Sequence, residues 1–100
     1  MIDYKIDTKY YIDYTTRFKK QFKNIAKQGK DLNKFLYVLK KLANKEKLER
    51  KYKDYELFDD RNFKNCREYH IESDWLLVYQ YQDEKLVLLL VSIGSHSELF

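Results

Sequence analysis

Two apolar segments and the short polar turn between them decide the fold. The segments are Trp75-Leu76-Leu77-Val78-Tyr79-Gln80-Tyr81-Gln82 and Lys85-Leu86-Val87-Leu88-Leu89-Leu90-Val91-Ser92-Ile93. Two apolar segments joined by so short a turn predict a hairpin of antiparallel strands at residues 75–82 and 85–93. Residues 86–91 are apolar at every position, which predicts a central strand covered on both faces. Gly94 is expected to end this strand and to leave a short tail at residues 95–100.

Upstream of the hairpin, the spacing of the apolar residues changes from a strand period to a helix period. Alternating apolar residues predict a first strand at residues 10–14. After it, apolar side chains recur every three or four residues, which is typical of amphipathic helices. We expect a first helix that is capped by Thr15 or Thr16 and closed by Gly29, and a second helix that begins after Asp31.

The rest of the chain indicates further strands. Tyr55 and Leu57 predict a short strand, residues 59–62 a turn and residues 64–71 another strand, which leads into the hairpin. The expected order is β-α-α-β-β-β-β, an α+β fold in which a two-helix hairpin packs on a single antiparallel sheet. A length of 100 residues indicates one domain over residues 1–100, with residues 1–9 as an extra N-terminal arm.

Positive charge is concentrated in one part of the chain. Residues 15–53 hold 14 Lys and Arg against 3 Asp and Glu, whereas residues 54–100 hold 4 against 10. So basic a segment indicates a polyanion or an acidic protein as partner, and a solvated helical surface is the alternative. The candidate RNA-binding lysines on the first helix are Lys19, Lys20, Lys23 and Lys27.

Several classes of protein are disfavoured by composition and by missing motifs. The single cysteine, Cys66, excludes an intramolecular disulfide, and neither zinc-ligand spacing nor a cofactor-binding motif occurs. The first ten residues do not look like a signal peptide, and the longest apolar run, residues 86–91, is far too short to span a bilayer. We therefore expect a cytoplasmic protein that uses no metal, cofactor or membrane.

The two histidines, His70 and His96, are the candidate proton carriers, because histidine ordinarily titrates near neutral pH. If their strands are neighbours, both imidazoles reach one edge of the sheet, with Asp74 between them. RNA cleavage without metal needs a base for the 2′-hydroxyl, an acid for the leaving 5′-oxygen and a cation beside the phosphorane. Structural or surface roles for both histidines remain the alternative.

Three other side chains are candidates for binding RNA. Arg67 can pair with a phosphate through two nitrogens, and a cross-strand ion pair is its alternative role. Trp75 and Phe100 can stack on bases, as aromatic residues of RNA-binding proteins often do. A place in the core is an equally good interpretation of Trp75.

Four segments resemble the YafQ branch of the RelE toxin superfamily, in the same order, over about residues 10–100. Residues 15–23, TTRFKKQFK, are similar to the family's opening T-x-x-F-K-K-D-F-K, and residues 52–57, YKDYEL, to Y-x-D-H-x-L. Residues 67–79, REYHIESDWLLVY, resemble R-[DE]-x-H-[IV]-x-P-D-W-[IL]-L-[IV]-Y. Residues 94–100, GSHSELF, resemble the closing G-[ST]-H-x-x-L-F.

The resemblance implies a toxin of a type II toxin–antitoxin system, an endonuclease that cuts messenger RNA in the aminoacyl site of the ribosome and so inhibits translation. Its expected partners are messenger RNA, ribosomal RNA and a cognate antitoxin. The antitoxin is expected to have a ribbon-helix-helix end and an acidic C-terminal half, and the toxin to reach operator DNA only through it. The resemblance places five residues on functional positions of the family: His70, Asp74, Trp75, His96 and Phe100.

In the resulting hypothesis, His70 and His96 share proton transfer and Asp74 orients an imidazole. Three positions depart from the family pattern: Tyr55 replaces a histidine, Ser92 an arginine and Ser73 a proline. Tyrosine can still donate a proton, but an ordinary pKa of about 10 makes it a poor base at pH 7, so we expect Tyr55 only to assist. Two alternatives follow: a ribosome-independent ribonuclease, or a catalytically weakened module that binds ribosome and antitoxin.

Overall fold

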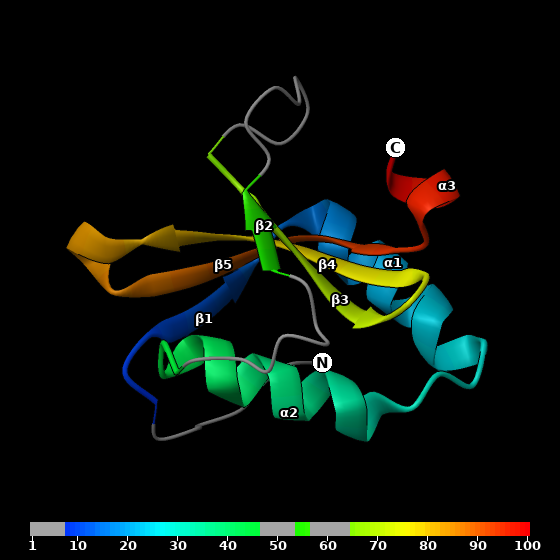
Figure 1. The fold of residues 1–100 in the computed structure, drawn as a ribbon, viewed down its shortest axis with the longest axis horizontal. Coiled ribbons are helices and arrows are strands. Elements are labelled where there is room, and N and C mark those ends of the chain that lie inside the picture. The colour runs from blue at the N-terminus through cyan, green and yellow to red at the C-terminus, as the bar shows by residue number, and fades with distance from the viewer. Residues whose placement is uncertain (1–7, 47–53, 57–64) are drawn as a thin grey trace.

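The computed structural model describes residues 8–46, 54–56 and 65–100 (Figure 1). It confirms the α+β class and the predicted order of elements, and it adds a short C-terminal helix. In chain order the elements are β1 (Tyr11–Tyr14), α1 (Thr16–Lys27), α2 (Leu32–Ala43), β2 (Asp54–Glu56), β3 (Arg67–Glu72), β4 (Trp75–Gln82), a 3-10 turn (Asp83–Lys85), β5 (Val87–Gly94) and α3 (His96–Leu99).

The described strands form one sheet in the order β1-β5-β4-β3-β2. Three of its four pairings are antiparallel, as predicted, whereas β1 lies parallel to β5 with Ile12 opposite Leu88. Local sequence does not indicate this parallel pairing, because the two partner strands are separated by most of the chain. Among the described strands, β4 lies in the middle of the sheet. The strand predicted to be central, β5, lies next to it and is paired with β1 on one side and β4 on the other.

The helix caps follow the prediction. Thr15 precedes α1, where its hydroxyl accepts a hydrogen bond from the Phe18 amide (3.0 Å) and donates one to the carbonyl of Val91 in β5 (2.7 Å). Asp31 caps α2 through the Asn33 amide (3.0 Å), and Gly29 between the helices has a φ of 73°. The Thr15 bond to β5 joins the start of α1 to the sheet.

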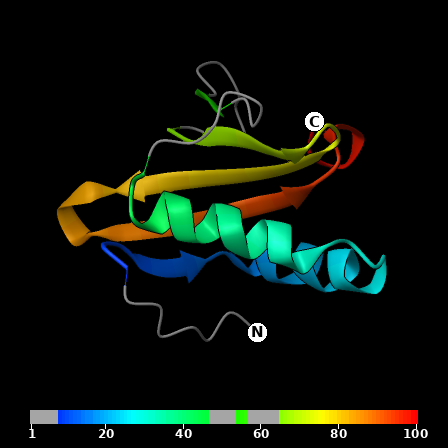
Figure 2. The same cartoon turned by 60° about the horizontal axis from the view of Figure 1, so that its bottom comes forward.

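The main core lies between the helices and one face of the sheet, and Figure 2 shows α2 running across that face. The Phe18, Phe22 and Phe35 rings contact one another there, with centroids 5.1–6.1 Å apart. A smaller apolar cluster includes Leu76 and Val78, which alternate along β4 with core residues and so lie on the opposite face. The candidate site lies on this second face.

The last strand and the tail differ from the prediction. The strand begins at Val87 instead of residue 85, because residues 83–85 form a 3-10 turn and Leu86 has a φ of 53° and is exposed. The predicted tail forms the helix α3, which a capping box of Ser95 and Glu98 begins. The prediction that this strand is covered on both faces is only partly correct. Leu88 and Leu90 on one face are buried, whereas Val87, Leu89 and Val91 on the other face are half-buried.

Two other predictions concern segments that lie partly or wholly outside the described residues. The predicted strand at residues 64–71 is β3 and begins at Arg67. The predicted turn at residues 59–62 and most of the N-terminal arm lie outside the described residues. Among the helices that are described, none combines the length and the apolar character needed to cross a membrane.

Candidate active site

Strand β3 presents two polar side chains on the face of the sheet that α1 and α2 do not cover. Tyr69 and Ile71 belong to the main core, so the alternation of a strand places Glu68 and His70 on the opposite face. The β3–β4 pairing shifts register between His70 and Glu72, which is a β-bulge directly beside the histidine. Bulges change the direction of neighbouring side chains and often lie next to active sites.

Helix α3 carries the second histidine to the same face. The strand β5 ends at Gly94, where an added Cβ would lie 3.2 Å from a Glu98 carboxylate oxygen and 3.4 Å from Leu99, so glycine allows the chain to fold back closely. Leu99 is buried with Leu76 and Val78 in the smaller apolar cluster. This contact holds α3 against the sheet and leaves His96 above β3.

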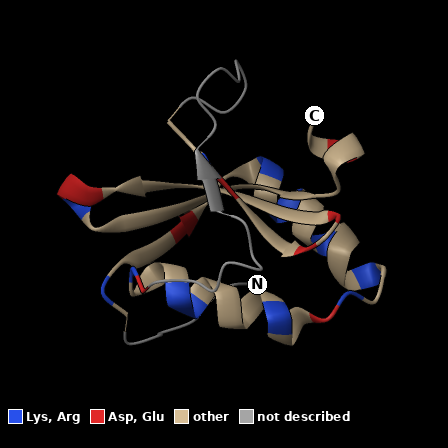
Figure 3. Ribbon diagram, viewed as in Figure 1, with Lys and Arg blue, Asp and Glu red and all other residues tan. Residues whose placement is uncertain are grey.

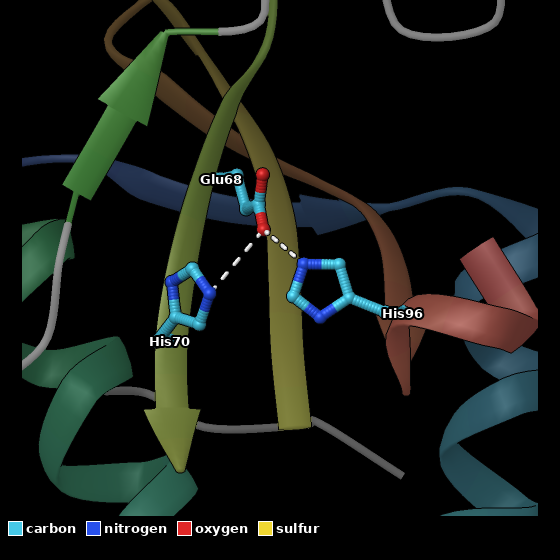
Figure 4. Close-up of side chains that lie close together, drawn as sticks. All are labelled: Glu68, His70 and His96. Carbon is cyan, nitrogen blue, oxygen red and sulfur yellow. Dashed lines mark ion pairs between the residues drawn. The ribbon is translucent and has the colours of Figure 1, made fainter. Parts of the chain in front are cut away.

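The two imidazoles meet at one carboxylate oxygen (Figure 4). Glu68 Oε1 lies 3.5 Å from His70 Nε2 and also 3.5 Å from His96 Nε2. The ring centroids of the histidines are 5.6 Å apart. The predicted meeting of His70 and His96 is therefore present in the structure, and Glu68 lies between them.

Asp74, in the turn between β3 and β4, holds the other side of His96. Its Oδ1 accepts a hydrogen bond from the His96 amide (2.9 Å) and lies 3.5 Å from His96 Nδ1. The His96 amide, followed by the His96 ring and the Lys30 ammonium, lowers the pKa of Asp74 below its ordinary value, so this carboxylate is charged at neutral pH. Asp74 was predicted to lie between the two histidines; Glu68 occupies that position instead, and Asp74 contacts His96 through the other ring nitrogen, where it can orient the ring.

The burial of these groups differs strongly. The Glu68 side chain is 10% exposed and the His70 side chain 14%, whereas those of His96 and Asp74 are 54% and 68% exposed. Glu68 Oε1 receives no hydrogen bond from any described residue. A buried carboxylate oxygen without a hydrogen-bond donor costs free energy unless a cation or a donor compensates it.

Phe100 lies beside His96, and Lys30 lies near Asp74. The Phe100 ring is 53% exposed and its centroid lies 6.0 Å from that of His96, so it offers a stacking surface beside the site, as predicted. Lys30, between α1 and α2, acts on Asp74 by its charge and lies 5.8 Å from the ring centroid of Trp75. The site thus has an aromatic surface beside His96 and a cation near Asp74.

Two predicted RNA contacts are corrected by the structure. The Trp75 side chain is completely buried in the main core, so its ring offers no surface for a base, and its role is packing. Arg67 shares the helix-covered face with Tyr69, because β3 alternates and its partner Tyr79 is a core residue. Arg67 therefore lies on the opposite face from Glu68 and His70 and is not placed to hold a phosphate beside them.

Three further predictions concern positions around the site. The β2–β3 register places Tyr55 opposite Glu68. Ser92 is completely buried and donates to Gln21 Oε1 of α1 (2.7 Å), so it supports packing where the family carries an arginine. Figure 3 shows blue segments, which are Lys or Arg, along both α1 and α2. The four predicted RNA-binding lysines of α1 are all exposed: Lys19, Lys20, Lys23 and Lys27.

Sequence reasoning missed Glu68 and Lys30. Glu68 precedes His70 by two residues on a predicted strand, so the period-two pattern places both on one face and was a usable signal. No local pattern distinguishes Lys30 from the other lysines, because its proximity to Asp74 arises from the packing of the helix connection against the β3–β4 turn. The burial of Glu68 likewise depends on α3 and is not readable from β3 alone.

The arrangement is suited to moving two protons at one place. His96 has a ring nitrogen 3.5 Å from the Glu68 carboxylate and another 3.5 Å from the Asp74 carboxylate, and an imidazole held in this way can serve as a proton donor. Glu68 and His70 form a buried pair that can accept a proton. A polar molecule with one acidic hydroxyl and one leaving oxygen is the kind of substrate that such a pair of groups can convert.

Comparisons with known proteins agree with the family that the motifs indicate. The family described as bacterial toxin of type II toxin-antitoxin system, YafQ, matches residues 10–100. The mRNA interferase toxin YafQ of Escherichia coli (strain B / BL21-DE3) is 36% identical over 90 residues, which cover 89% of this chain and 94% of that protein.

Solved structures share the fold. The metal-bound toxin from Helicobacter pylori is 41% identical, with a TM-score of 0.84 over 91% of this chain and 99% of that one. The E. coli DinJ–YafQ toxin–antitoxin complex contains a chain that is 33% identical, with a TM-score of 0.80 over 92% of this chain and 98% of that one. Both solved structures are therefore similar to this chain in sequence as well as in fold.

Proposed function

The chain belongs to the YafQ family of bacterial toxins of type II toxin–antitoxin systems, and on that premise we propose that it is an endoribonuclease that cleaves messenger RNA on the ribosome. Its relatives named mRNA interferase support this activity. The observation that carries the proposal is the placement of Glu68 Oε1 at 3.5 Å from both imidazoles. This arrangement supports a mechanism in which side chains act as proton acceptor and proton donor.

In the proposed reaction, the 2′-oxygen of RNA attacks the adjacent phosphorus and the bond from phosphorus to the 5′-oxygen breaks. The Glu68–His70 pair takes the proton of the 2′-hydroxyl, and His96 gives its proton to the leaving 5′-oxygen. The products are a 2′,3′-cyclic phosphate and a 5′-hydroxyl. Asp74 holds His96, Phe100 stacks on a base, Lys30 supplies positive charge near the phosphate and Tyr55 assists.

The substrate's own 2′-hydroxyl provides the test of this mechanism. A messenger RNA programmed on ribosomes should be cut by the purified chain, and a single 2′-deoxy substitution before the cleaved bond should abolish cutting there. The same RNA without ribosomes is the control for ribosome dependence, and a rate that ribosomes do not change would favour a free ribonuclease. Translation inhibition with no cut RNA would instead favour a binding module.

We also propose a cognate antitoxin as partner, supported by the solved complex of DinJ with the structurally similar YafQ chain. Its acidic C-terminal half would bind the basic helices, and its ribbon-helix-helix end would contact operator DNA, which the toxin itself does not touch. Because messenger RNA and ribosomes are cytoplasmic, the toxin would act in the cytoplasm. Copurification with the product of an adjacent reading frame tests the partner directly.

The exposed lysines of α1 are expected to give salt-dependent docking on ribosomal RNA. Each phosphate neutralised contributes about −0.7 to −0.9 to the slope of log affinity against log salt concentration. Changing Lys19 and Lys23 to alanine should therefore weaken ribosome binding and reduce the slope by about 1.4 to 1.8 if both contact phosphate. Sedimentation of the toxin with ribosomes at several salt concentrations measures the slope.

A matched pair of exposed lysines outside α1, Lys9 and Lys85, provides the control. Their double alanine variant loses the same charge and should keep the wild-type slope. If the two double variants behave alike, the α1 lysines form a solvated surface with no specific role in docking.

A further inference from the structure

The three groups that meet at the site also have the composition of a transition-metal site. Two imidazole nitrogens and one carboxylate oxygen form the ligand set that Zn²⁺ takes in open sites, where water fills the fourth position. We propose that Glu68, His70 and His96 bind one Zn²⁺ ion, and that the bound ion inhibits the nuclease. The inhibition rests on the proposed function, whereas the binding does not.

The distances fit such an ion. Tetrahedral Zn²⁺ with ligand bonds of about 2.0–2.2 Å has adjacent ligand atoms roughly 3.3–3.6 Å apart. Glu68 Oε1 lies 3.5 Å from each of the two Nε2 atoms, and the three donor atoms all lie within 4.8 Å of one another. Only the separation of the two imidazoles has to shorten, and the half-exposed His96 ring can rotate to shorten it.

The buried carboxylate gives an independent reason for a cation here. Glu68 is 8% exposed, and its Oε1 receives no hydrogen bond from the described part of the chain. A buried charged oxygen without a donor is costly unless a cation or a donor compensates it. Figure 4 shows this oxygen directed toward both histidines, so one ion can compensate the charge and use both rings as ligands.

Metal binding and proton transfer need the same atoms. An ion on His70 Nε2 and His96 Nε2 occupies the lone pairs that must accept or carry a proton, and it neutralises the Glu68 carboxylate. The proton transfers proposed above use only side chains and no metal. We therefore expect Zn²⁺ to inhibit cleavage, and chelation to restore it.

Binding is tested first, without RNA. Untagged chain is titrated with zinc chloride by calorimetry, while the imidazole C–H signals are followed by NMR. Because the chain has only two histidines, both signal sets report on this site. We expect one ion per chain and a shift of both signal sets at that stoichiometry. No binding, several equivalent ions, or a shift of only one imidazole would overturn the site.

Two variants sharpen the result. Glu68→Gln keeps the shape but loses the charged ligand and should weaken Zn²⁺ binding by at least about 100-fold. Glu72→Gln, on the same strand and paired with Lys34 at 3.4 Å, should bind as the wild type does. Equal affinity of the Glu68→Gln and wild-type chains would contradict the site, and the NMR measurement on wild type does not depend on how the variant folds.

The inhibition is then measured on RNA. Cleavage in EDTA should proceed at the uninhibited rate, and saturating Zn²⁺ should lower it at least tenfold, with recovery on adding EDTA. Unchanged or faster cleavage with bound Zn²⁺ would refute inhibition. A chain that binds Zn²⁺ but never cuts RNA would refute the proposed nuclease and its inhibition while leaving the metal site intact.

Discussion

Replacement of His96 by alanine is expected to lower the rate of RNA cleavage by at least about 100-fold, the low end of what a general acid contributes. His96 is the proposed proton donor, and the structure describes no other imidazole that lies between two carboxylates. Single-turnover cleavage of ribosome-bound messenger RNA measures the loss. Because the His96 side chain is half exposed, unfolding free energy should change by less than about 0.5 kcal/mol.

Ser97→Ala is the matched control for His96→Ala. Ser97 follows His96 in α3, is exposed and lies outside the proposed chemistry. The control should keep wild-type cleavage, and circular dichroism should show both variants folded. Wild-type cleavage by folded His96→Ala protein would remove this residue from the mechanism.

Glu68→Gln is expected to separate activity from stability. The amide cannot take a proton, so cleavage should fall by about 100-fold or more. The same change removes a buried charge whose Oε1 accepts no hydrogen bond from the described residues, so the free energy of unfolding should stay within about 1 kcal/mol of wild type or rise. Denaturant unfolding alongside the cleavage assay measures both quantities.

The control for this second variant is Glu72→Gln, which removes one carboxylate from the same strand at a half-buried surface position. It should leave the cleavage rate unchanged. Glu68→Gln protein that cleaves at the wild-type rate would show that the base is another group. Protein that loses activity only because it unfolds more easily would show a structural role.

Much of the fold was predictable because its signals are local. The caps Thr15 and Asp31 and the start of β4 lie where side-chain pattern and capping chemistry place them. The parallel pairing of β1 with β5 was not predictable, since it is a contact between distant segments with no local signal. The helix α3 did have a signal, because Ser95 and Glu98 form an S-x-x-E capping box.

The site was predictable where motifs carry it and not where tertiary packing creates it. The motifs indicated that His70, Asp74 and His96 belong to one site. In the structure the two histidine rings lie close together and Asp74 contacts His96. The roles assigned to these residues stay proposals. The burial of Trp75 was left open by the sequence, since a tryptophan at a strand end suits both a core and a stacking surface. The central position of Glu68 arises only when α3 folds back, so the pattern of β3 did not disclose it.

A second β-bulge, at Val91 in β5, shows where this chain can gain or lose residues over evolutionary time. In the β4–β5 ladder, Tyr79 pairs with Leu90 and Val78 with Ser92, so Val91 is the extra residue. Deleting Val91 would remove the bulge and leave these pairs in place, whereas deleting a paired residue such as Leu90 would shift the following residues by one position and turn their side chains to the other face. Length variation is therefore expected at the exposed turn residues Glu84 and Lys85, at the other end of the hairpin, where the ladder registers are unaffected.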